Sequence, residues 1–587
     1  MRRVTILTLI ILFTLGTAIM YAAQPQTDQA GRGGAGARGG GMMGGRGGAG
    51  ARGGMMGGGM MGGMMGGRGG TPPAWIEPGY DDHQNMMDQL GIKTLRPGKS
   101  GSNQTGPGFD EATANEWMPT MPDALTMNDG TKVTTAAQWP KRRAEILEAF
   151  ESEVYGRIPA NVPKVTWEVT NTTEGSVGDV PTITKTLVGH VDNSDFNQIT
   201  VNIQASFTVP ANATGKVPMF LSFGGGMGFG MNLENNNQTT FYATYQPTAN
   251  GNGLFSLAAA AGDAAGTRGG AGARGGMMGG MMGGRGGAGG RGGIMGGMGG
   301  GGGANSVSNQ AITHGWGYGS INPGSIQADS GGNSLRQGII GLTNKGQPRK
   351  PDDWGALRAW QWGVSRLIDY FEANPDSKVD ATKVSIEGVS RYGKAALVTE
   401  AFEPRLAVAL VASSGEGGAK LHRHDFGESV ENLAATSEYH WMCGNWLKYA
   451  ASDINGKSMD ASDLPVDSHE LIALCAPRPC FISYGVPNPS TGMMGDPAWV
   501  DAHGSYMAGV LATPVYELLG KKGFGDANLF KTDKEKFYSA PMPSVSTLVG
   551  GELAWRQHEG GHESGPNIPT FFEWIGAYIK SPAAPAD

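Results

Sequence analysis

The chain has few cysteines and no cationic excess, and each of these absences excludes a class of protein. Of its 587 residues only three are cysteines, Cys443, Cys475 and Cys480, so at most one disulfide can form and the chain is no disulfide scaffold. The formal net charge is −7, and because the glycine-rich segments carry arginines, the remainder is more acidic still. This balance argues against a nucleic-acid-binding core, and we expect no nucleic acid partner.

A continuous apolar run stands at the N-terminus, in "MRRVTILTLIILFTLGTAIMYAAQ". Two arginines precede it, which is typical of a signal peptide. We expect residues 1–23 to be cleaved, which predicts a secreted or periplasmic protein without a stable membrane partner. If it stays uncut, the run is long enough to anchor the chain in a membrane.

Two glycine-rich segments have little that a core could bury. Residues 31–70 contain only Gly, Ala, Arg and Met, and a similar segment runs over about 264–305. Burial there cannot offset the entropy of ordering, so we expect 24–70 to be disordered and 264–305 to be a disordered insertion. Between them, 71–135 is predicted to be an irregular N-terminal extension, and 136–587 the folded domain.

Within the folded domain, short apolar runs alternate with amphipathic ones. Helices are predicted at 136–156, 352–374 and 569–580, and strands at 164–170, 199–210, 217–223, 383–389, 406–415, 480–486 and 554–562. This alternation predicts an α/β fold, a mostly parallel central sheet with helices on both faces. Function is then expected in the loops at the carboxyl ends of the strands.

The stretch "EGVSRYGKAAL" places a serine between a predicted strand and a predicted helix. A serine nucleophile on such a strained turn is typical of α/β-hydrolases, usually within G-x-S-x-G. Here Gly388 stands two residues before Ser390, but Tyr392 takes the place of the second glycine and Gly393 follows it. The turn alone leaves two possibilities open, a nucleophile or a serine that caps the helix.

A nucleophilic serine needs a base and an acid, which follow it in the order acid, histidine in α/β-hydrolases. His562, in the glycine-flanked loop "EGGHESG" after the last predicted strand, fits the base, and His558 is its competitor. The acid holds the imidazole in the right tautomer. Its candidates are Asp496 and Asp501 in "GDPAWVDAHG" and Glu416 in "SSGEGG".

The serine turn resembles the G-C-S-R-x-G-K-x-A signature of glucuronoyl esterases, carbohydrate esterase family 15. Further stretches, in order along the chain, are similar to the family: "WPKRRAEILEAFESEVYGRIP", "SSGEGGAKLHRHDFGESVENL", "HWMCGNW", "DSHELIALCAPRPCFIS", "DPAWVDAHGSY" and "EGGHES". The resemblance spans 139–580 apart from the glycine-rich insertion. It implies a three-layer α/β-hydrolase that acts through an acyl-enzyme on esters of glucuronic acid or its 4-O-methyl form, which join glucuronoxylan to lignin.

The resemblance also implies roles for individual residues. By position these would be Ser390 as nucleophile, His562 as base, Arg391 at the oxyanion, Lys394 and Glu428 on sugar hydroxyls, and Trp499 beside the acid. The charges agree with this, because basic residues in the first turn of a helix oppose its dipole and are disfavoured for a purely structural role.

The chain departs from the family at the acid. Some members carry a glutamate where Ser413 stands here, and Glu416 lies three residues further on. Others carry an aspartate two residues before the tryptophan, where Pro497 stands, one residue after Asp496. We expect Asp496 to be the acid, with Glu416 as the alternative. Val389 replaces a common cysteine with another small apolar residue.

Three further motifs point to other ligands but lack supporting residues. "GGGMGFG" at 224–230 lacks dinucleotide-binding spacing and is expected instead near the oxyanion site. "HRH" at His422–His424 could bind a metal, but no third ligand is apparent. The "GGMMGG" repeats could bind copper through thioethers, although a flexible linker explains them as well. We therefore expect no cofactor and no metal.

The sequence thus favours a monomeric serine esterase acting on glucuronoxylan or lignin–carbohydrate esters. One alternative within the same class is an acetyl-xylan esterase or other carbohydrate esterase. An alternative of a different class is a non-catalytic surface or matrix protein that works through its Gly/Arg/Met repeats, with the hydrolase-like domain as a scaffold.

Overall fold

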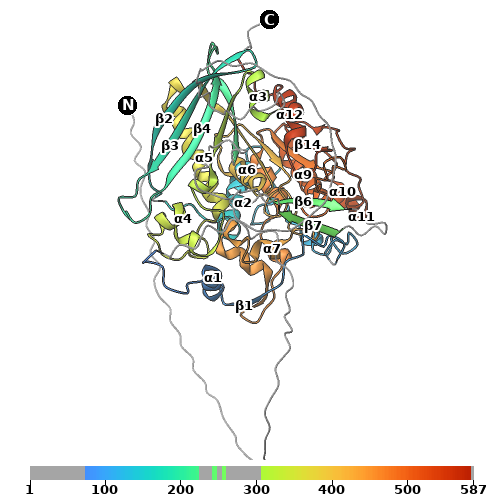
Figure 1. The fold of residues 1–587 in the computed structure, drawn as a ribbon. Helices are drawn as coiled ribbons and strands as arrows, with labels where there is room; N and C mark the ends of the chain where they lie inside the picture. Colours follow the sequence, from blue (N-terminus) through green and yellow to red (C-terminus); the bar gives the residue numbers. More distant parts are fainter. Residues whose placement is uncertain are drawn as a thin grey trace, which may run out of the picture. The chain divides into compact units, whose positions relative to one another are not determined.

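The computed structural model describes residues 73–223, 241–246, 254–259 and 306–582, apart from Pro107 and Asn161 (Figure 1). The predicted signal peptide, both glycine-rich segments and the loop at 224–230 lie outside the described residues. The described residues all belong to one unit of the chain, Gly58–Asp587.

Ten strands form one mixed sheet, in the order β13-β14-β12-β10-β9-β5-β8-β4-β3-β2. Their bounds are Val549–Gly550, Leu553–His558, Cys480–Gly485, Val408–Ala412, Val379–Val389, Val217–Phe223, Gly317–Ile321, Asn202–Pro210, Val180–Val191 and Val165–Val177, in that order. The strands from β14 to β8 pair in parallel. β13 and the β4-β3-β2 meander pair antiparallel. The parallel sheet expected from sequence is therefore confirmed for the part that carries the site, whereas one end is an antiparallel meander.

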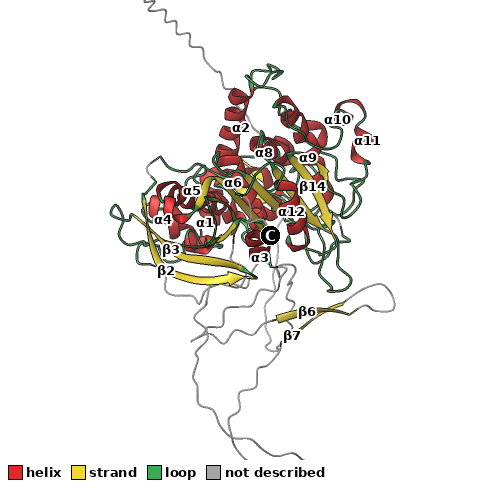
Figure 2. Cartoon of the chain, turned by 90° about the horizontal axis from the view of Figure 1, so that it is seen from above, coloured by secondary structure: helices red, strands yellow, loops and turns green. Residues whose placement is uncertain are grey.

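Helices cover both faces of the sheet (Figure 2). On one face lie α2 (Trp139–Glu153), α5 (Ala356–Ala373), α6 (Arg391–Phe402), α8 (Ser468–Cys475) and α9 (Ala502–Leu518), and on the other α3 (Val307–Thr313) and α12 (Ile568–Ile575). Alternate residues of the parallel strands enter two separate apolar cores, as the two-residue period of a strand requires. In β5, Phe220 packs on Phe571 and Phe572 of α12, with ring centroids 5.3 Å apart in each pair, whereas Met219 and Leu221 enter the other core.

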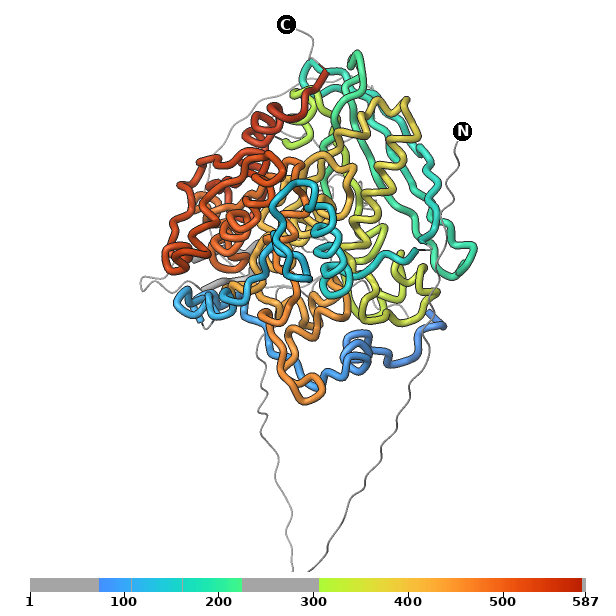
Figure 3. The backbone as a smooth tube through the Cα atoms, turned by 180° about the vertical axis from the view of Figure 1, so that it is seen from behind, coloured from blue at the N-terminus to red at the C-terminus, as the bar shows by residue number. Residues whose placement is uncertain are grey.

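Within the N-terminal extension, a short helix and a short strand stand among turns and irregular segments. Residues Asp82–Leu90 form α1, whose first N–H groups bind the Asp81 carboxylate and whose last turn ends at Gly91 with φ +71°. Strand β1 (Ile92–Leu95) follows and pairs antiparallel with β11 (Ala451–Ile454). Figure 3 shows this extension, in blue, beside the orange segments that follow the nucleophile turn.

Shorter elements complete the described chain. These are α4 (Gly338–Thr343), α7 (Val430–Ala434), α10 (Leu529–Thr532), α11 (Lys534–Tyr538) and the hairpin of β6 (Phe241–Gln246) and β7 (Leu254–Ala259). All three cysteines are free and buried, so they form no disulfide. Among the described residues, no helix has the length and apolar character that crossing a membrane requires.

Candidate active site

Ser390 lies on a strained turn between β9 and α6. Its backbone has φ 61° and ψ −126°, a region that non-glycine residues rarely occupy and that costs of the order of 1–3 kcal/mol. Its side chain makes no capping hydrogen bond to the helix. The helix-cap interpretation is therefore wrong, and the geometry is that of a nucleophile turn, which exposes its serine beyond the sheet.

Two glycines permit this turn because the backbone approaches itself closely. A Cβ on Gly388 would lie 2.2 Å from the carbonyl oxygen of Tyr392, and one on Gly393 would lie 2.3 Å from that of Ala412. Both distances are far below any real Cβ contact. Gly393 thus takes the role of the second glycine in G-x-S-x-G, one residue later than in the usual spacing. The turn can therefore accommodate Tyr392 in the usual glycine position.

A buried carboxylate and a histidine meet beside this turn. Nδ1 of His562 lies 2.6 Å from Oδ1 of Asp496. Asp496 is fully buried, and its Oδ2 accepts hydrogen bonds from the Ser413 hydroxyl, at 2.6 Å, and from the backbone N–H of Gly485. The His562 side chain remains 32% exposed, so its other nitrogen can meet a ligand.

The three candidate triad residues follow strands of the parallel part of the sheet. Ser390 follows β9, and its N–H donates to the carbonyl of Ala412, at the end of β10, over 3.0 Å. Asp496 follows β12, and His562 follows β14, with its N–H donating to Met494 in the Asp496 loop over 2.8 Å. The parallel pairing therefore gathers all three at the carboxyl edge, as the sequence predicts. Among the described residues, no hydrogen bond joins the Ser390 hydroxyl to the His562 ring.

Both ring nitrogens of His558, the competing base, form hydrogen bonds within its own loop. Its Nδ1 accepts the N–H of Gly560 at 3.0 Å, so its Nε2 carries the proton and donates to the carbonyl of Glu563 at 2.9 Å. Burial lowers the pKa of His558, which keeps the ring neutral. Both ring nitrogens thus serve the loop that presents His562.

Two carboxylates considered as the acid have other partners. Glu416 is fully buried and binds Nζ of Lys420 at 2.8 Å and Nδ1 of His422 at 2.5 Å. Burial alone would raise the pKa of Glu416, but the charges of Lys420 and His422 lower it. Asp501 caps α9 and lies 2.6 Å from Nδ1 of His424. The structure therefore leaves Asp496 as the carboxylate on His562 and does not place Glu416 there.

The residues expected to bind sugar lie together, but they are bonded to each other. Nζ of Lys394 lies 2.8 Å from Oε2 of Glu428 and 2.6 Å from the carbonyl of Ser414. The N–H of Glu428 donates to the carbonyl of Trp499 at 2.7 Å. Sequence reasoning missed Glu438 in the same cluster, where burial and the charge of Glu428 raise the pKa of its carboxyl to about 8.

Arg391 is held by an aspartate that the sequence did not indicate. Its Nη1 donates to Oδ2 of Asp329 at 2.6 Å, and Oδ1 of Asp329 accepts from His440 at 2.9 Å and from the Trp441 indole at 2.7 Å. Burial would raise the pKa of Asp329, but these donors hold it well below its usual range. No spacing rule links Asp329 to the nucleophile turn, because the contact joins segments distant in sequence.

Beneath the turn, Glu387 of β9 is a buried acid with polar partners on two other segments. Its carboxyl oxygens accept from the hydroxyl of Ser222, at the end of β5, at 3.1 Å, and from the hydroxyl of Ser564, two residues after His562, at 3.3 Å. Burial raises its pKa from 4.5 to about 7. Glu387 thus links the loop of His562 to β9, the strand that precedes Ser390.

We predict that Glu387 makes the stability of the fold fall as the pH rises from about 4.5 to about 7. In this window the folded state retains a proton that the unfolded chain releases, so folding is favoured most below the lower value. The effect is roughly 3 kcal/mol at most. Chemical denaturation of wild type and Glu387→Gln at several pH values measures it, and the variant should show the flatter profile.

The control for this experiment is Glu174→Gln, which changes an exposed glutamate on β2. Its profile should match that of the wild type. An unchanged slope in Glu387→Gln would show that Glu387 has the same pKa in the folded and unfolded states and contributes nothing to the pH dependence.

Comparison with known proteins agrees with this geometry. A family model described as "Glucuronyl esterase, fungi" matches residues 349–520. Carbohydrate esterase MZ0003, from an unknown prokaryotic organism, is 31% identical over 458 residues, which cover 78% of this chain and 88% of that protein. The 4-O-methyl-glucuronoyl methylesterase 1 of Wolfiporia cocos is 36% identical over 171 residues, 28% of this chain and 38% of its own length.

Solved structures extend the likeness over most of the chain. A CE15 glucuronoyl esterase from Teredinibacter turnerae superposes with a TM-score of 0.63 and 31% identity, and covers 84% of this chain and 98% of its own. A glucuronoyl esterase from Solibacter usitatus gives 0.56 and 27%, covering 78% and 97%. Together with the nucleophile turn and the mixed sheet, these matches show that the chain belongs to the glucuronoyl esterases of carbohydrate esterase family 15, which are carboxylic ester hydrolases with an α/β-hydrolase fold.

Proposed function

We propose that the chain hydrolyses esters of glucuronic acid or its 4-O-methyl form, such as the linkages between lignin and glucuronoxylan, with Ser390, His562 and Asp496 as its triad. The observation that carries the proposal is the 2.6 Å contact between His562 Nδ1 and the buried Asp496, beside a serine held at φ 61°. The names of the fungal relatives, 4-O-methyl-glucuronoyl methylesterases, support the substrate class. Export to the periplasm or the medium, where such polymers lie, is part of the proposal.

In the first half of the reaction, the Ser390 hydroxyl attacks the ester carbonyl while Nε2 of His562 accepts its proton. Asp496 engages Nδ1, so it fixes the tautomer in which Nε2 is free, and it stabilises the imidazolium that forms. The tetrahedral intermediate collapses when the imidazolium gives the proton to the leaving alcohol. Water then attacks the acyl-enzyme, with His562 again as the base, and releases the uronic acid and Ser390.

Arg391 is proposed to stabilise the oxyanion. It is permanently charged and adjacent to the nucleophile, and its ion pair with Asp329 fixes the guanidinium. A donor of this kind is worth about 3–4 kcal/mol in the transition state.

Lys394, Glu428 and Trp499 are proposed to contact the sugar. Lys394 and Glu428 are nearly buried and satisfy each other, so substrate hydroxyls would exchange part of that contact for hydrogen bonds of their own. Membership of an esterase family favours this function over a non-catalytic matrix protein.

Replacing the nucleophile tests the function. We expect Ser390→Ala to lower kcat on benzyl glucuronate by at least about 10⁴-fold without changing the melting temperature appreciably, because only the attacking oxygen is lost. Ser194→Ala, on an exposed turn, is the matched control and should behave as wild type. Parallel assays on acetylated xylan identify the substrate class: activity on the acetyl ester alone would support the acetyl-xylan esterase alternative instead.

The acid is tested by a pair of amide substitutions. Asp496→Asn should lower kcat about 10⁴-fold, because an amide cannot hold the tautomer or stabilise the imidazolium. Glu416→Gln should instead lower the melting temperature, since it leaves the charge of Lys420 buried and unpaired, and should retain most of kcat in the folded fraction. The reverse order of the two kcat values would make Glu416 the acid.

A further inference from the structure

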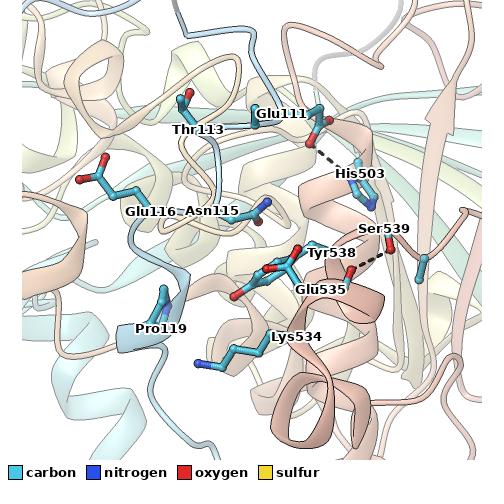
Figure 4. Close-up of a pocket in the computed structure, with 12 residues that line it drawn as sticks. Glu111, Thr113, Asn115, Glu116, Pro119, His503, Lys534, Glu535, Tyr538 and Ser539 are labelled. Atoms are coloured by element: carbon cyan, nitrogen blue, oxygen red, sulfur yellow. Dashed lines mark hydrogen bonds and ion pairs between the residues drawn. The ribbon is translucent and has the colours of Figure 1, made fainter.

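A cluster of two histidines and a glutamate lies outside the proposed triad. Nε2 of His424 lies 3.4 Å from Oε2 of Glu111, and Nδ1 of His503 lies 3.7 Å from the same oxygen. Figure 4 shows Glu111 and His503 of this cluster. These three ligand atoms all lie within 4.8 Å of one another. His424 comes from the "HRH" motif, for which the sequence offered no third ligand, whereas its neighbour His422 is bonded to Glu416.

The surroundings of the His424 ring favour its binding to a metal ion through Nε2. Its side chain is fully buried, and its Nδ1 lies 2.6 Å from Oδ2 of Asp501. A proton on Nδ1 donated to Asp501 leaves the lone pair of Nε2 free, and a carboxylate on the far nitrogen is the usual partner of a metal-binding histidine. Among the described residues, this buried Nε2 has no hydrogen-bond partner, and it faces Glu111 and His503.

Both separations from the Glu111 oxygen suit a metal ion. A tetrahedral zinc ion with bonds of about 2.1 Å separates neighbouring ligand atoms by about 3.4 Å. The separations of 3.4 Å and 3.7 Å from Glu111 are close to that value. Two imidazoles and one carboxylate form a donor set of borderline softness, which favours zinc-like divalent ions over calcium or magnesium.

The cluster is also accessible to an ion from one side. Glu111 and His503 line a cavity of about 1010 Å³, together with Asn115, Lys534 and Tyr538 (Figure 4). The Glu111 side chain is 53% exposed and that of His503 is 18% exposed. Three protein ligands leave one tetrahedral position for water on the cavity side.

We propose that Glu111, His424 and His503 bind one divalent transition-metal ion of the zinc class, with Asp501 orienting His424. The ion would join three segments: the N-terminal extension, the segment after the nucleophile turn, and the first turn of α9. Hydrogen bonds already connect the first two of these segments. The N–H of Asp425 donates to the carbonyl of Ala114, and the N–H of Gly427 donates to that of Gly108. The ion would therefore stabilise the packing of these three segments, and its ligands include none of the proposed triad residues.

A protonated His424 is the competing state of this cluster. Burial alone would lower the pKa of His424, but Asp501 and Glu111 raise it to about 9 when no metal is bound. An imidazolium between two carboxylates would hold the same segments together as an ion-pair cluster. A direct measurement of metal binding separates the two states.

The test uses the full chain, purified without a histidine tag and stripped with a chelator. Titration with Zn²⁺ in a calorimeter should give one site and a higher melting temperature. Titration with Co²⁺ should give the visible absorption bands of a four-coordinate ion. Glu111→Gln and His503→Gln should each weaken binding at least about tenfold and remove the rise in melting temperature, because each removes one ligand.

Glu116→Gln and His314→Gln are the matched controls. Glu116 lines the same cavity outside the cluster, and His314 is an exposed histidine stacked on Phe572. Both should bind as tightly as the wild type. The cluster variants retain the triad, so they should keep their kcat at temperatures where they are folded, which separates this result from any failure of the proposed function.

Two outcomes would overturn the proposal. The first is that the wild type shows no saturable binding of Zn²⁺ or Co²⁺. The protonated His424 between two carboxylates would then be the state of this cluster. The second is binding that Glu111→Gln and His503→Gln do not weaken. In that case a thiolate-to-cobalt charge-transfer band in the near ultraviolet would assign the ion to the buried group of Glu400, Cys475 and Cys480.

Discussion

The site depends on one buried charge, the carboxylate of Asp496. A fully buried anion costs several kcal/mol unless donors surround it. Here the Ser413 hydroxyl and the N–H of Gly485 bind one oxygen and the His562 ring binds the other, so the carboxylate is satisfied only when three separate segments are in place. The order of the strands supplies these segments, since β10, β12 and β14 are parallel neighbours. The requirement to solvate Asp496 therefore fixes the position of His562.

The same contact explains how the chain departs from its family at the acid. Ser413 stands where some members carry a glutamate, and its hydroxyl binds Asp496 at 2.6 Å. A serine cannot act as the acid, but its hydroxyl can orient a carboxylate that does. On the proposed triad, the position would support the acid through Asp496 here, whereas the resemblance implies that it supplies the acid itself in those members.

The features that could be predicted from the sequence are those that local residue patterns determine. Buried parallel strands such as β5 and β12, and the Gly388–Ser390–Gly393 turn, follow from apolar runs and close-approach glycines that any reader of the sequence can find. The His562 loop follows from chain order. Strands β3 and β8 were missed: β3 is largely half-buried and shows no regular alternation of buried and exposed residues, and β8 is a short segment with few apolar side chains. Asp329, Glu438 and Glu111 were missed because each meets its partner only across the folded chain.

The ion pairs beside Ser390 have a consequence for the release of product. Each cation there has its own counterion, Asp329 for Arg391 and Glu428 for Lys394. On the proposed reaction the substrate is a neutral ester, whereas the product is a uronate anion. A site with unpaired cations would retain that anion and slow turnover. Because each cation is already paired, the net electrostatic attraction of the site for the uronate product would be smaller than that of unpaired cations, which would favour its release.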